Sequence, residues 1–315
     1  MTTLADVSFQ ANTVPSSSPQ PASIPPQSPP ATSGLRPYLE LMRLHKPVGT
    51  LLLLWPTLAA LWMAAATTPA WHLIAIFSLG TLLMRSAGCV INDYADRHVD
   101  GAVERTRMRP LVTGAVKPGA ALALFAGLSA AAGLLVLLLN LTTIMLACGG
   151  LGVAILYPFM KRWTHMPQAV LGAAFSWGIL MAWTATSGAL PAVAALMFCA
   201  SVIWIIAYDT MYAMVDRADD LQVGIKSSAI LFGRNDRSII AGLQVVTIGL
   251  LIGVGLAQGY QGPYYAGLLG MCGCFVWQQR LIAERQRDNC LRAFNNNTWA
   301  GFALFAGTVI ELGLG

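Results

Sequence analysis

The sequence predicts an all-α protein that crosses a membrane nine times, and three observations support this prediction. Of the 315 residues, 56% are hydrophobic and only 10% are charged, whereas soluble globular domains carry about 25% charged residues. The chain contains nine apolar stretches, each close to the roughly 20 residues that a transmembrane helix needs. Lysine and arginine concentrate in alternate loops, as in other polytopic membrane proteins.

The chain divides into a short tail and one long domain. Residues 1–34 contain seven of the seventeen prolines and no lysine or arginine. We expect a disordered tail here, because such a composition cannot bury a core. Residues 35–315 are expected to form one transmembrane domain. Its predicted spans are 48–66, 71–91, 119–139, 141–159, 168–187, 190–208, 238–258, 262–278 and 296–314.

The basic residues give an independent test of this topology. If the segment before the first span is cytoplasmic, every loop with lysine or arginine lies on the cytoplasmic side, and the opposite loops contain neither. Arg85, inside the second span, is the exception. Because cytoplasmic loops carry an excess of these residues, the pattern favours nine spans. It also accounts for the net charge of +5 without a nucleic-acid partner.

A first acidic motif leaves the second span. It reads NDYADRHVD over residues 92–100. If these residues continue the helix, Asn92, Asp96 and Asp100 share one face, because they are spaced four residues apart. Asp93 joins that face at a spacing of three from Asp96.

A second acidic motif leaves the sixth span, and it reads DTMYAMVDRADD over residues 209–220. On a helix, Asp209, Asp216 and Asp220 share a face. Carboxylates packed this closely repel one another, and Mg²⁺ is the cation that prefers one or two carboxylates together with water and a substrate phosphate. The alternative interpretation is two solvated helix ends paired with nearby arginines. Two such motifs on one side of the membrane favour a diphosphate site with magnesium.

These residues resemble a known family. The first motif, with RTRMRP at 105–110 and TG at 113–114, is similar to the first signature of the UbiA superfamily of intramembrane prenyltransferases, and the second motif is similar to its second signature. The resemblance covers residues 36–314, and further matching segments are RLHKPVG at 43–49, YPFMKR at 157–162, PQ at 167–168 and LGAAF at 171–175. It implies nine helices around a central cavity with a cytoplasmic cap, in the bacterial inner membrane, with the active site facing the cytoplasm.

The resemblance also implies metal ligands. Asn92 and Asp96 are expected to bind one Mg²⁺ ion, with Asp100 close by. Asp216 and Asp220 are expected to bind a second ion. An alanine at position 218 replaces an acid found in some relatives, but it leaves the spacing of the two aspartates unchanged.

The resemblance and the chemistry together suggest further site residues. Lys161 and Arg162 match a basic pair that meets the diphosphate, and they are expected to stabilise the departing charge. Arg109 and Lys226 are further candidates for diphosphate binding. Tyr157 lies near the motifs, where its ring could shield a cation, although tyrosines also occur in the interfacial belt of membrane proteins.

The acceptor half of the site is predicted from fewer residues. Arg43 matches an arginine at the end of the site where an aromatic acid binds. Asp93 or Asp209 could orient or deprotonate this acceptor. The flanking segments are most similar to the branch that transfers a polyprenyl group from polyprenyl diphosphate to 4-hydroxybenzoate in bacterial ubiquinone synthesis, and another aromatic or quinone acceptor is the alternative.

Two other classes of protein fit the sequence less well than an enzyme does. A transporter would place charges at the membrane midplane on broken helices of paired inverted repeats, whereas here the charges gather at one face. A cation-binding structural protein would need neither both acidic motifs nor the Lys161–Arg162 pair. An integral membrane prenyltransferase therefore explains more of the sequence.

Overall fold

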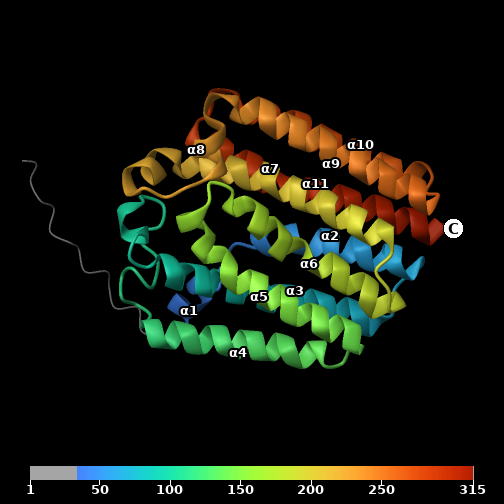
Figure 1. Cartoon of the computed structure of the whole chain (residues 1–315), viewed down its shortest axis with the longest axis horizontal. Coiled ribbons are helices and arrows are strands. Elements are labelled where there is room, and N and C mark those ends of the chain that lie inside the picture. Colours follow the sequence, from blue (N-terminus) through green and yellow to red (C-terminus); the bar gives the residue numbers. More distant parts are fainter. Residues whose placement is uncertain (1–33, 315) are drawn as a thin grey trace, which may run out of the picture. The chain divides into compact units, whose positions relative to one another are not determined.

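The computed structural model describes residues 34–314, in which the regular secondary structure is helical. The predicted tail at residues 1–34 therefore lies outside the described part of the chain, apart from Gly34. The elements are α1 (Arg36–Leu41), α2 (Val48–Ala65), α3 (Trp71–Asp96), η1 (Asp100–Ala102), α4 (Pro118–Val136), α5 (Leu141–Trp163), α6 (Pro167–Ser187), α7 (Ala192–Val223), α8 (Ser228–Phe232), η2 (Gly233–Asn235), α9 (Asp236–Gln258), α10 (Gly262–Leu281), η3 (Ile282–Glu284) and α11 (Arg287–Leu314) (Figure 1).

Each predicted span corresponds to one long helix among α2–α7 and α9–α11. Seven helical segments in residues 34–314 are long and apolar enough to cross a membrane, and they cover α2 to α7 and the segment from α8 to α9. The all-helical membrane fold is thus confirmed. The two C-terminal helices, α10 and α11, fall outside this group, so the ninefold crossing is not established by hydropathy.

The helices α10 and α11 are less apolar because they carry amide side chains that bind one another. The Gln244 amide of α9 donates to Gln278 at 2.8 Å, and Gln278 donates to Asn296 of α11 at 3.0 Å. The two C-terminal helices also pack closely, since a Cβ atom on Gly267 would lie 2.6 Å from the Ala303 carbonyl oxygen. Hydrogen-bonded amides and small residues at a helix interface are typical of packing inside a membrane.

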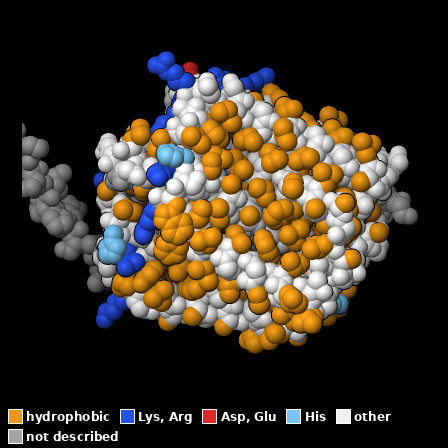
Figure 2. All heavy atoms as spheres, in the orientation of Figure 1, with side chains coloured by type: hydrophobic (Ala, Val, Ile, Leu, Met, Phe, Trp, Pro, Cys, Tyr) orange, Lys and Arg blue, Asp and Glu red, His pale blue; other side chains and the backbone are white. Residues whose placement is uncertain are grey.

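The long helices lie side by side, and both acidic motifs end at the same end of the bundle (Figure 1). The largest apolar core lies between α2, α6, α7 and α11 and includes Leu61, Ile179, Trp204 and Leu304. On the face shown in Figure 2, lysine and arginine side chains gather toward the end where α3 and α7 finish. Hydrophobic side chains cover most of the remainder of that face, as expected for a surface in contact with lipid.

The helix that carries the second motif extends well beyond the predicted span at 190–208, because α7 continues without interruption to Val223. The expected sharing of one helix by Asp209, Asp216 and Asp220 is confirmed. The corresponding expectation for the first motif is wrong, because α3 ends at Asp96 and Asp100 lies in η1. Arg97 contributes to this end, because its guanidinium donates to the Tyr94 carbonyl at 2.6 Å and occupies an acceptor of the last helical turn.

Candidate active site

A cavity of ≈ 990 Å³ runs between α2, α3, α4, α5, α6 and α7. Most of the predicted site residues line it, although they are far apart in the sequence. They are Arg43, Asn92, Asp93, Asp96, Asp100, Arg109, Tyr157, Asp209, Asp216, Asp220 and Lys226. One end of the cavity is therefore polar. We call residues 92–109 its first wall and residues 209–220 its second wall.

Two arginines organise the first wall. The Arg43 guanidinium binds both carboxylate oxygens of Asp93, at 2.9 and 3.1 Å. Arg109 Nη1 lies 2.9 Å from Asp93 Oδ1 and 2.5 Å from Asp100 Oδ2. Arg109 therefore holds Asp100 beside the end of α3 although Asp100 has left that helix. The Thr106 hydroxyl fixes the same turn, because it donates to the Asp100 carbonyl at 2.7 Å.

An arginine of the first wall reaches across to the second. Arg105 Nε lies 3.0 Å from Asp216 Oδ1, and Arg105 Nη2 lies 2.5 Å from Asp216 Oδ2. Its guanidinium carbon also lies 4.7 Å from the centre of the Tyr212 ring, a cation–π distance. Such a bidentate arginine–carboxylate pair fixes geometry more closely than a single contact does. The two walls are thus joined through Arg105.

The second wall is also held from behind. Asp236, fully buried at the start of α9, accepts hydrogen bonds from Arg217 of α7 and, at 2.8 Å, from Arg285 Nη2. Arg285 adopts a left-handed backbone with φ of 55°, a conformation that costs a non-glycine residue energy. This carboxylate therefore fastens α7 to the connection between α10 and α11.

A second outer link starts at Arg287, the first residue of α11. Its guanidinium lies 2.8 Å from Glu104 of the first wall and 2.8 Å from Asp219 of the second. Asp219 therefore faces away from the cavity toward the α10–α11 connection. Its neighbour Asp220 lines the cavity.

The residues predicted to bind magnesium have suitable chemistry. The Asn92 side-chain oxygen is buried and accepts no hydrogen bond from any described residue. It lines the same cavity end as Asp96, Asp216 and Asp220, and hard oxygen donors are what Mg²⁺ prefers. Within residues 34–314, no three His, Cys, Asp or Glu side chains form a ready-made cluster. One or two carboxylates for each ion is the usual number for Mg²⁺ when phosphate and water complete the shell, so the donor set fits.

Burial and neighbouring charges shift the pKa of two groups at the polar end of the cavity, Asp100 and Lys46. Burial raises the pKa of the Asp100 carboxyl group, and Asp96 raises it further, whereas Arg109 opposes the rise. Lys46, in the segment before α2, lines the same end and makes no ion pair with any described residue. Burial lowers the pKa of Lys46, and the neighbouring arginines at 43, 105 and 109 lower it further. Arg43, Arg105 and Arg109 each bind a carboxylate, so Lys46 is the cation of this group that a diphosphate would supply with an anionic partner.

Deeper in the cavity, Arg85 points into the space below the acidic motifs, as its place on α3 predicts. Its guanidinium lies over the start of α2, where a Cβ atom on Gly49 would come within 2.5 Å of it. Arg85 Nη1 donates to Cys89 Sγ at 2.7 Å, and the guanidinium carbon lies 5.6 Å from the Phe175 ring centre. Arg85 Nε is buried and finds no acceptor among the described residues.

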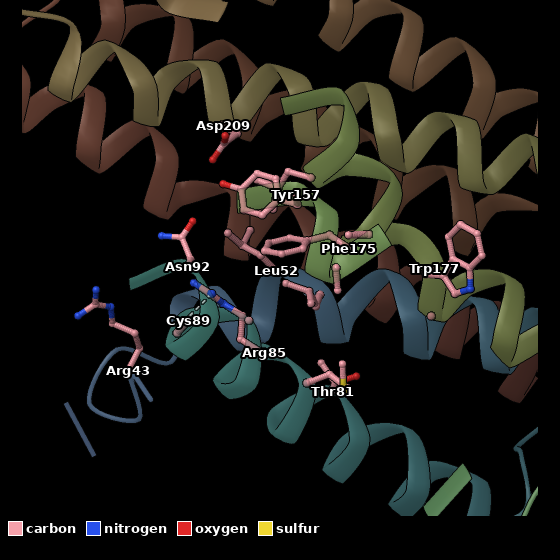
Figure 3. Close-up of a pocket in the computed structure, with 18 of the residues that line it drawn as sticks. Arg43, Leu52, Thr81, Arg85, Cys89, Asn92, Tyr157, Phe175, Trp177 and Asp209 are labelled. Carbon is pink, nitrogen blue, oxygen red and sulfur yellow. Dashed lines mark hydrogen bonds between the residues drawn. The ribbon is translucent and has the colours of Figure 1, made fainter. Parts of the chain in front are cut away.

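Figure 3 shows Arg85, Asn92, Tyr157 and Asp209 directed toward one space, from α3, α5 and α7. Phe175 of α6 lies beside that space. An arginine and a carboxylate that face each other across an apolar ring suit a small aromatic acid, which has an anionic end and a hydrophobic body.

The predicted diphosphate ligands Lys161, Arg162 and Lys226 differ in their relation to the cavity. The side chain of Lys161 lies outside the described part of the structure. Arg162 does not line the cavity; it donates to the Ala95 carbonyl at 3.0 Å and so binds the last turn of α3. Lys226 lines the cavity, and its ammonium lies 3.4 Å from the Trp163 carbonyl oxygen. Direct diphosphate binding by Lys161 and Arg162 stays a prediction.

Two residues that sequence reasoning did not place in the site are Arg105 and Lys46. Both lie inside segments that resemble the family signatures, RTRMRP and RLHKPVG. A basic residue in a cytoplasmic loop is also what membrane orientation requires, so neither stood out from its neighbours. The structure distinguishes them, because both line the cavity whereas Arg97, Arg107 and Lys117 do not.

The cavity beyond Arg85 is apolar. It continues between α3, α4, α5 and α6 toward the opposite end of the bundle, where the turn between α4 and α5 lies. Residues that line this part include Ile76, Phe77, Val136, Leu139, Ile144 and Met181. A polar chamber joined to an apolar channel suits an amphipathic molecule with a charged head and a hydrocarbon tail.

Comparisons with known proteins agree with this geometry. A curated 4-hydroxybenzoate octaprenyltransferase of Alcanivorax borkumensis is 57% identical to the chain, over 88% of this chain and 96% of that protein. The apo structure of a UbiA homologue from Aeropyrum pernix K1 has a TM-score of 0.75 and 24% identity, and the match covers 83% of this chain and 97% of that one. A UbiA homologue from Archaeoglobus fulgidus, solved bound to GPP and Mg²⁺, has a TM-score of 0.64 and 16% identity over 88% of this chain and 99% of that one.

The family model described as the UbiA prenyltransferase family matches residues 53–305. This range includes both acidic motifs and every helix from α3 to α10. The chain therefore belongs to the UbiA prenyltransferase family.

Proposed function

We propose that the protein transfers a polyprenyl group from polyprenyl diphosphate to the aromatic ring of 4-hydroxybenzoate and releases diphosphate. The observation that carries this proposal is that one cavity of ≈ 990 Å³ holds every part the reaction needs. Its polar end contains both acidic motifs and several cations, the space beside Phe175 suits an aromatic acid, and the apolar channel suits a hydrocarbon tail. The 57% identity to a 4-hydroxybenzoate octaprenyltransferase supports the choice of donor and acceptor.

The diphosphate end of the reaction rests on both walls. Asn92 and Asp96 would hold one Mg²⁺ ion with Asp100 nearby, and Asp216 and Asp220 would hold the other. When bound, the metal would supply positive charge that stabilises the departing diphosphate. The homologue solved with GPP and Mg²⁺ supports this choice of metal.

The cations of the chain itself stabilise the same leaving group. Arg105, Arg109 and Lys46 line the cavity at the acidic motifs, where fixed positive charge lowers the energy of the charge that develops on the diphosphate. Arg105 and Arg109 bind carboxylates in this structure, so their N–H donors are already directed into the site. The allylic carbon–oxygen bond breaks as the diphosphate departs.

The acceptor end rests on Arg85 and Asp209. Arg85 would bind the carboxylate of 4-hydroxybenzoate through its unpartnered Nε and hold the ring beside Phe175. Asp209, on the other side of that space (Figure 3), would receive the proton that leaves when the new carbon–carbon bond forms. Asp93, the other candidate, lies in the first wall, where its oxygens accept hydrogen bonds from Arg43 and its Oδ1 lies 2.9 Å from Arg109.

The membrane topology completes the proposal. Nine spans would bring the end with the acidic motifs to the cytoplasmic side of a bacterial inner membrane, where loop residues 97–117 would cap the cavity. Two features support this arrangement. Besides the seven most apolar segments, α10 and α11 lie in the same bundle, where the amide side chains of Gln278 and Asn296 are hydrogen-bonded. The lysine and arginine side chains gather toward the end where both motifs lie (Figure 2).

A turnover assay tests the proposal. The purified protein in detergent or liposomes is incubated with a labelled polyprenyl diphosphate, 4-hydroxybenzoate and Mg²⁺, with EDTA in a parallel sample. We expect ring-prenylated 4-hydroxybenzoate in the first sample and none in the second. The absence of any prenylated product with a panel of aromatic acceptors would remove the proposal, and a product with a different acceptor alone would correct only the acceptor.

Variants separate the two ends. Asp209→Asn is expected to abolish turnover while it leaves the binding of prenyl diphosphate unchanged, and Arg85→Gln is expected to raise the KM for 4-hydroxybenzoate. Asp93→Asn, in the first wall, tests the other candidate base. An equal loss of acceptor turnover in Asp93→Asn and Asp209→Asn would contradict the assignment of Asp209.

A further inference from the structure

Three helical glycines line the cavity at positions where a side chain would meet no neighbour. At Gly88 and Gly80 on α3, and at Gly133 on α4, a Cβ atom would meet no other atom within 4 Å. All three residues line the cavity. Because glycine weakens a helix by roughly 1 kcal/mol relative to alanine, and no neighbour excludes a side chain at these positions, packing does not account for them.

Other glycines of the same helices and their neighbours are different. A Cβ atom on Gly150 of α5 would lie 2.6 Å from the Trp177 ring, and one on Gly172 of α6 would lie 3.1 Å from Val202. Trp177 is fixed in this position, since its indole N–H donates to the Leu146 carbonyl at 2.7 Å. These glycines allow neighbouring helices to pack in close contact. Gly80, Gly88 and Gly133, which we call the open glycines, instead enlarge the cavity between the helices.

The open glycines lie at different depths. Gly88 is four residues before Asn92 and Gly80 is twelve residues before it, which at the rise of an α-helix places them about 6 Å and about 18 Å along α3 from the metal-binding end. Gly133 is 15 residues after the start of α4, about 22 Å along that helix. Because α4 runs back from the end where α3 finishes (Figure 1), Gly80 and Gly133 both lie deep in the channel.

A polar network lies near the turn between α4 and α5. The Asn140 amide donates to the Thr184 carbonyl at 2.6 Å, and the buried Thr143 hydroxyl donates to Asn140 at 2.9 Å. These bonds tie the start of α5 to the end of α6. The residues that line the channel extend from the acidic motifs to Val136, Leu139 and Ile144 near that turn.

We propose that Gly80 and Gly133 determine the length of the prenyl tail that the enzyme accepts, by leaving space for the part of a long tail that lies about 18 Å or more from the diphosphate. This inference rests on the proposed function and identifies positions that select among its substrates. The tail reaches the enzyme from lipid, which is as apolar as the channel, so burial there gains little hydrophobic free energy. Selection therefore comes from the steric exclusion of tails that do not fit.

The test is a scan of tail length. Rates with all-trans prenyl diphosphates from geranyl to solanesyl diphosphate are compared for the wild type, Gly80→Leu and Gly133→Leu. We expect both variants to retain the wild-type rate with geranyl diphosphate and to lose about tenfold or more in kcat/KM with the longest tails, because a leucine overfills the deep channel. Gly88→Leu, close to the reaction centre, is expected to reduce kcat/KM for every tail.

The matched control is Gly127→Leu. Gly127 is on the same helix as Gly133, a Cβ atom there also meets nothing within 4 Å, and it does not line the cavity. Gly127→Leu should leave the dependence of kcat/KM on tail length, the length profile, unchanged. The alanine variants of Gly80 and Gly133 add a smaller side chain, and they give the answer if a leucine variant fails to fold; their preference should shift in the same direction by a smaller factor.

The outcomes are distinct. A length profile that is unchanged in both the leucine and the alanine variants would overturn the inference and would show that the tail leaves between helices into the lipid. An equal loss for short and long tails would overturn it as well. A wild type that transfers no prenyl group of any length would instead remove the proposed function.

Discussion

The two walls of the polar end are held in place in different ways. The first wall is fixed by ion pairs inside the cavity, where Arg109 lies 2.9 Å from Asp93 and 2.5 Å from Asp100. The second wall is one continuous helix that is anchored from behind, where Asp236 binds Arg285 at 2.8 Å. The carboxylates of the first wall therefore depend on cations that also belong to the site. The helix of the second wall is held in addition by a clamp outside the site, besides the Arg105–Asp216 pair that joins the two walls.

This difference predicts a separation of functions. A change in the first wall should alter substrate binding and the arrangement of the carboxylates together, because the same arginines serve both. A change in the clamp behind the second wall should act first on stability. The four experiments below test this separation, in order of decreasing expected effect.

The largest effect is expected from Asp236→Ala. This variant leaves Arg217 and Arg285 without their shared carboxylate, and the loss of one partner of a buried ion pair costs about 3–5 kcal/mol. We expect a loss near the lower value, because both arginines are partly exposed. Thermal unfolding in detergent without substrates measures it. Asp288→Ala, an exposed acid at the start of α11, is the control, and an equal change in both variants would contradict the clamp.

Asp216→Ala should chiefly affect turnover. We expect a fall in kcat of about 10²–10³-fold, the usual cost of removing one group that stabilises developing charge. The neighbouring acid Asp219 faces outward toward Arg287, so Asp219→Asn should retain most activity. Initial rates across a magnesium titration distinguish the two variants. If Asp219→Asn is as inactive as Asp216→Ala, the assignment of inner and outer faces to α7 is wrong.

Lys46 provides a test by pH at the first wall. Because burial and the neighbouring arginines lower its pKa, Lys46 loses its charge at a lower pH than an exposed lysine does. The KM for prenyl diphosphate should therefore rise as pH increases through the alkaline range, by about tenfold when a charged hydrogen bond is lost. Lys46→Arg should flatten this rise, because arginine stays protonated. A pH profile that is the same in both proteins would exclude Lys46 from diphosphate binding.

The smallest effect is expected from Arg287→Gln. Its ion pairs with Glu104 and Asp219 are on the surface, with 42% of the Arg287 side chain exposed, and exposed pairs contribute about 0.2–1 kcal/mol. Thermal unfolding at low and high salt measures this, and added salt should reduce the difference from the wild type. A loss as large as that of Asp236→Ala would show that the outer link, rather than the buried one, holds the second wall.

The sequence predicted most of the fold and the second wall. Apolar stretches gave all nine long helices to within a few residues at most ends, because helix length in a bilayer is set by its thickness. The second wall was predictable because it is a single helix, and the spacing of Asp209, Asp216 and Asp220 on a helix is fixed. Hydropathy gave less information about α10 and α11, whose buried Gln278 and Asn296 are stabilised by each other.

The first wall could not be predicted to the same depth. Asp100 leaves α3 and is brought back by Arg109, and no local pattern encodes this return. Asp236 and Arg285 are likewise 49 positions apart, and each is unremarkable in its own segment. The place of Arg105 in the cavity likewise depends on a distant segment, because its partner Asp216 lies on α7. Contacts between distant segments decide these positions, and a single sequence does not record them.

The open glycines of the channel have a consequence for the evolution of the enzyme. Since a Cβ atom at Gly80 or Gly133 would meet no neighbouring atom within 4 Å, a small side chain there can be accepted without loss of the fold. Descendants of one ancestral gene could thus acquire different tail preferences through single substitutions, while the residues that perform the chemistry remain unchanged. Product diversity and catalytic constancy would then evolve at separate positions of the same cavity.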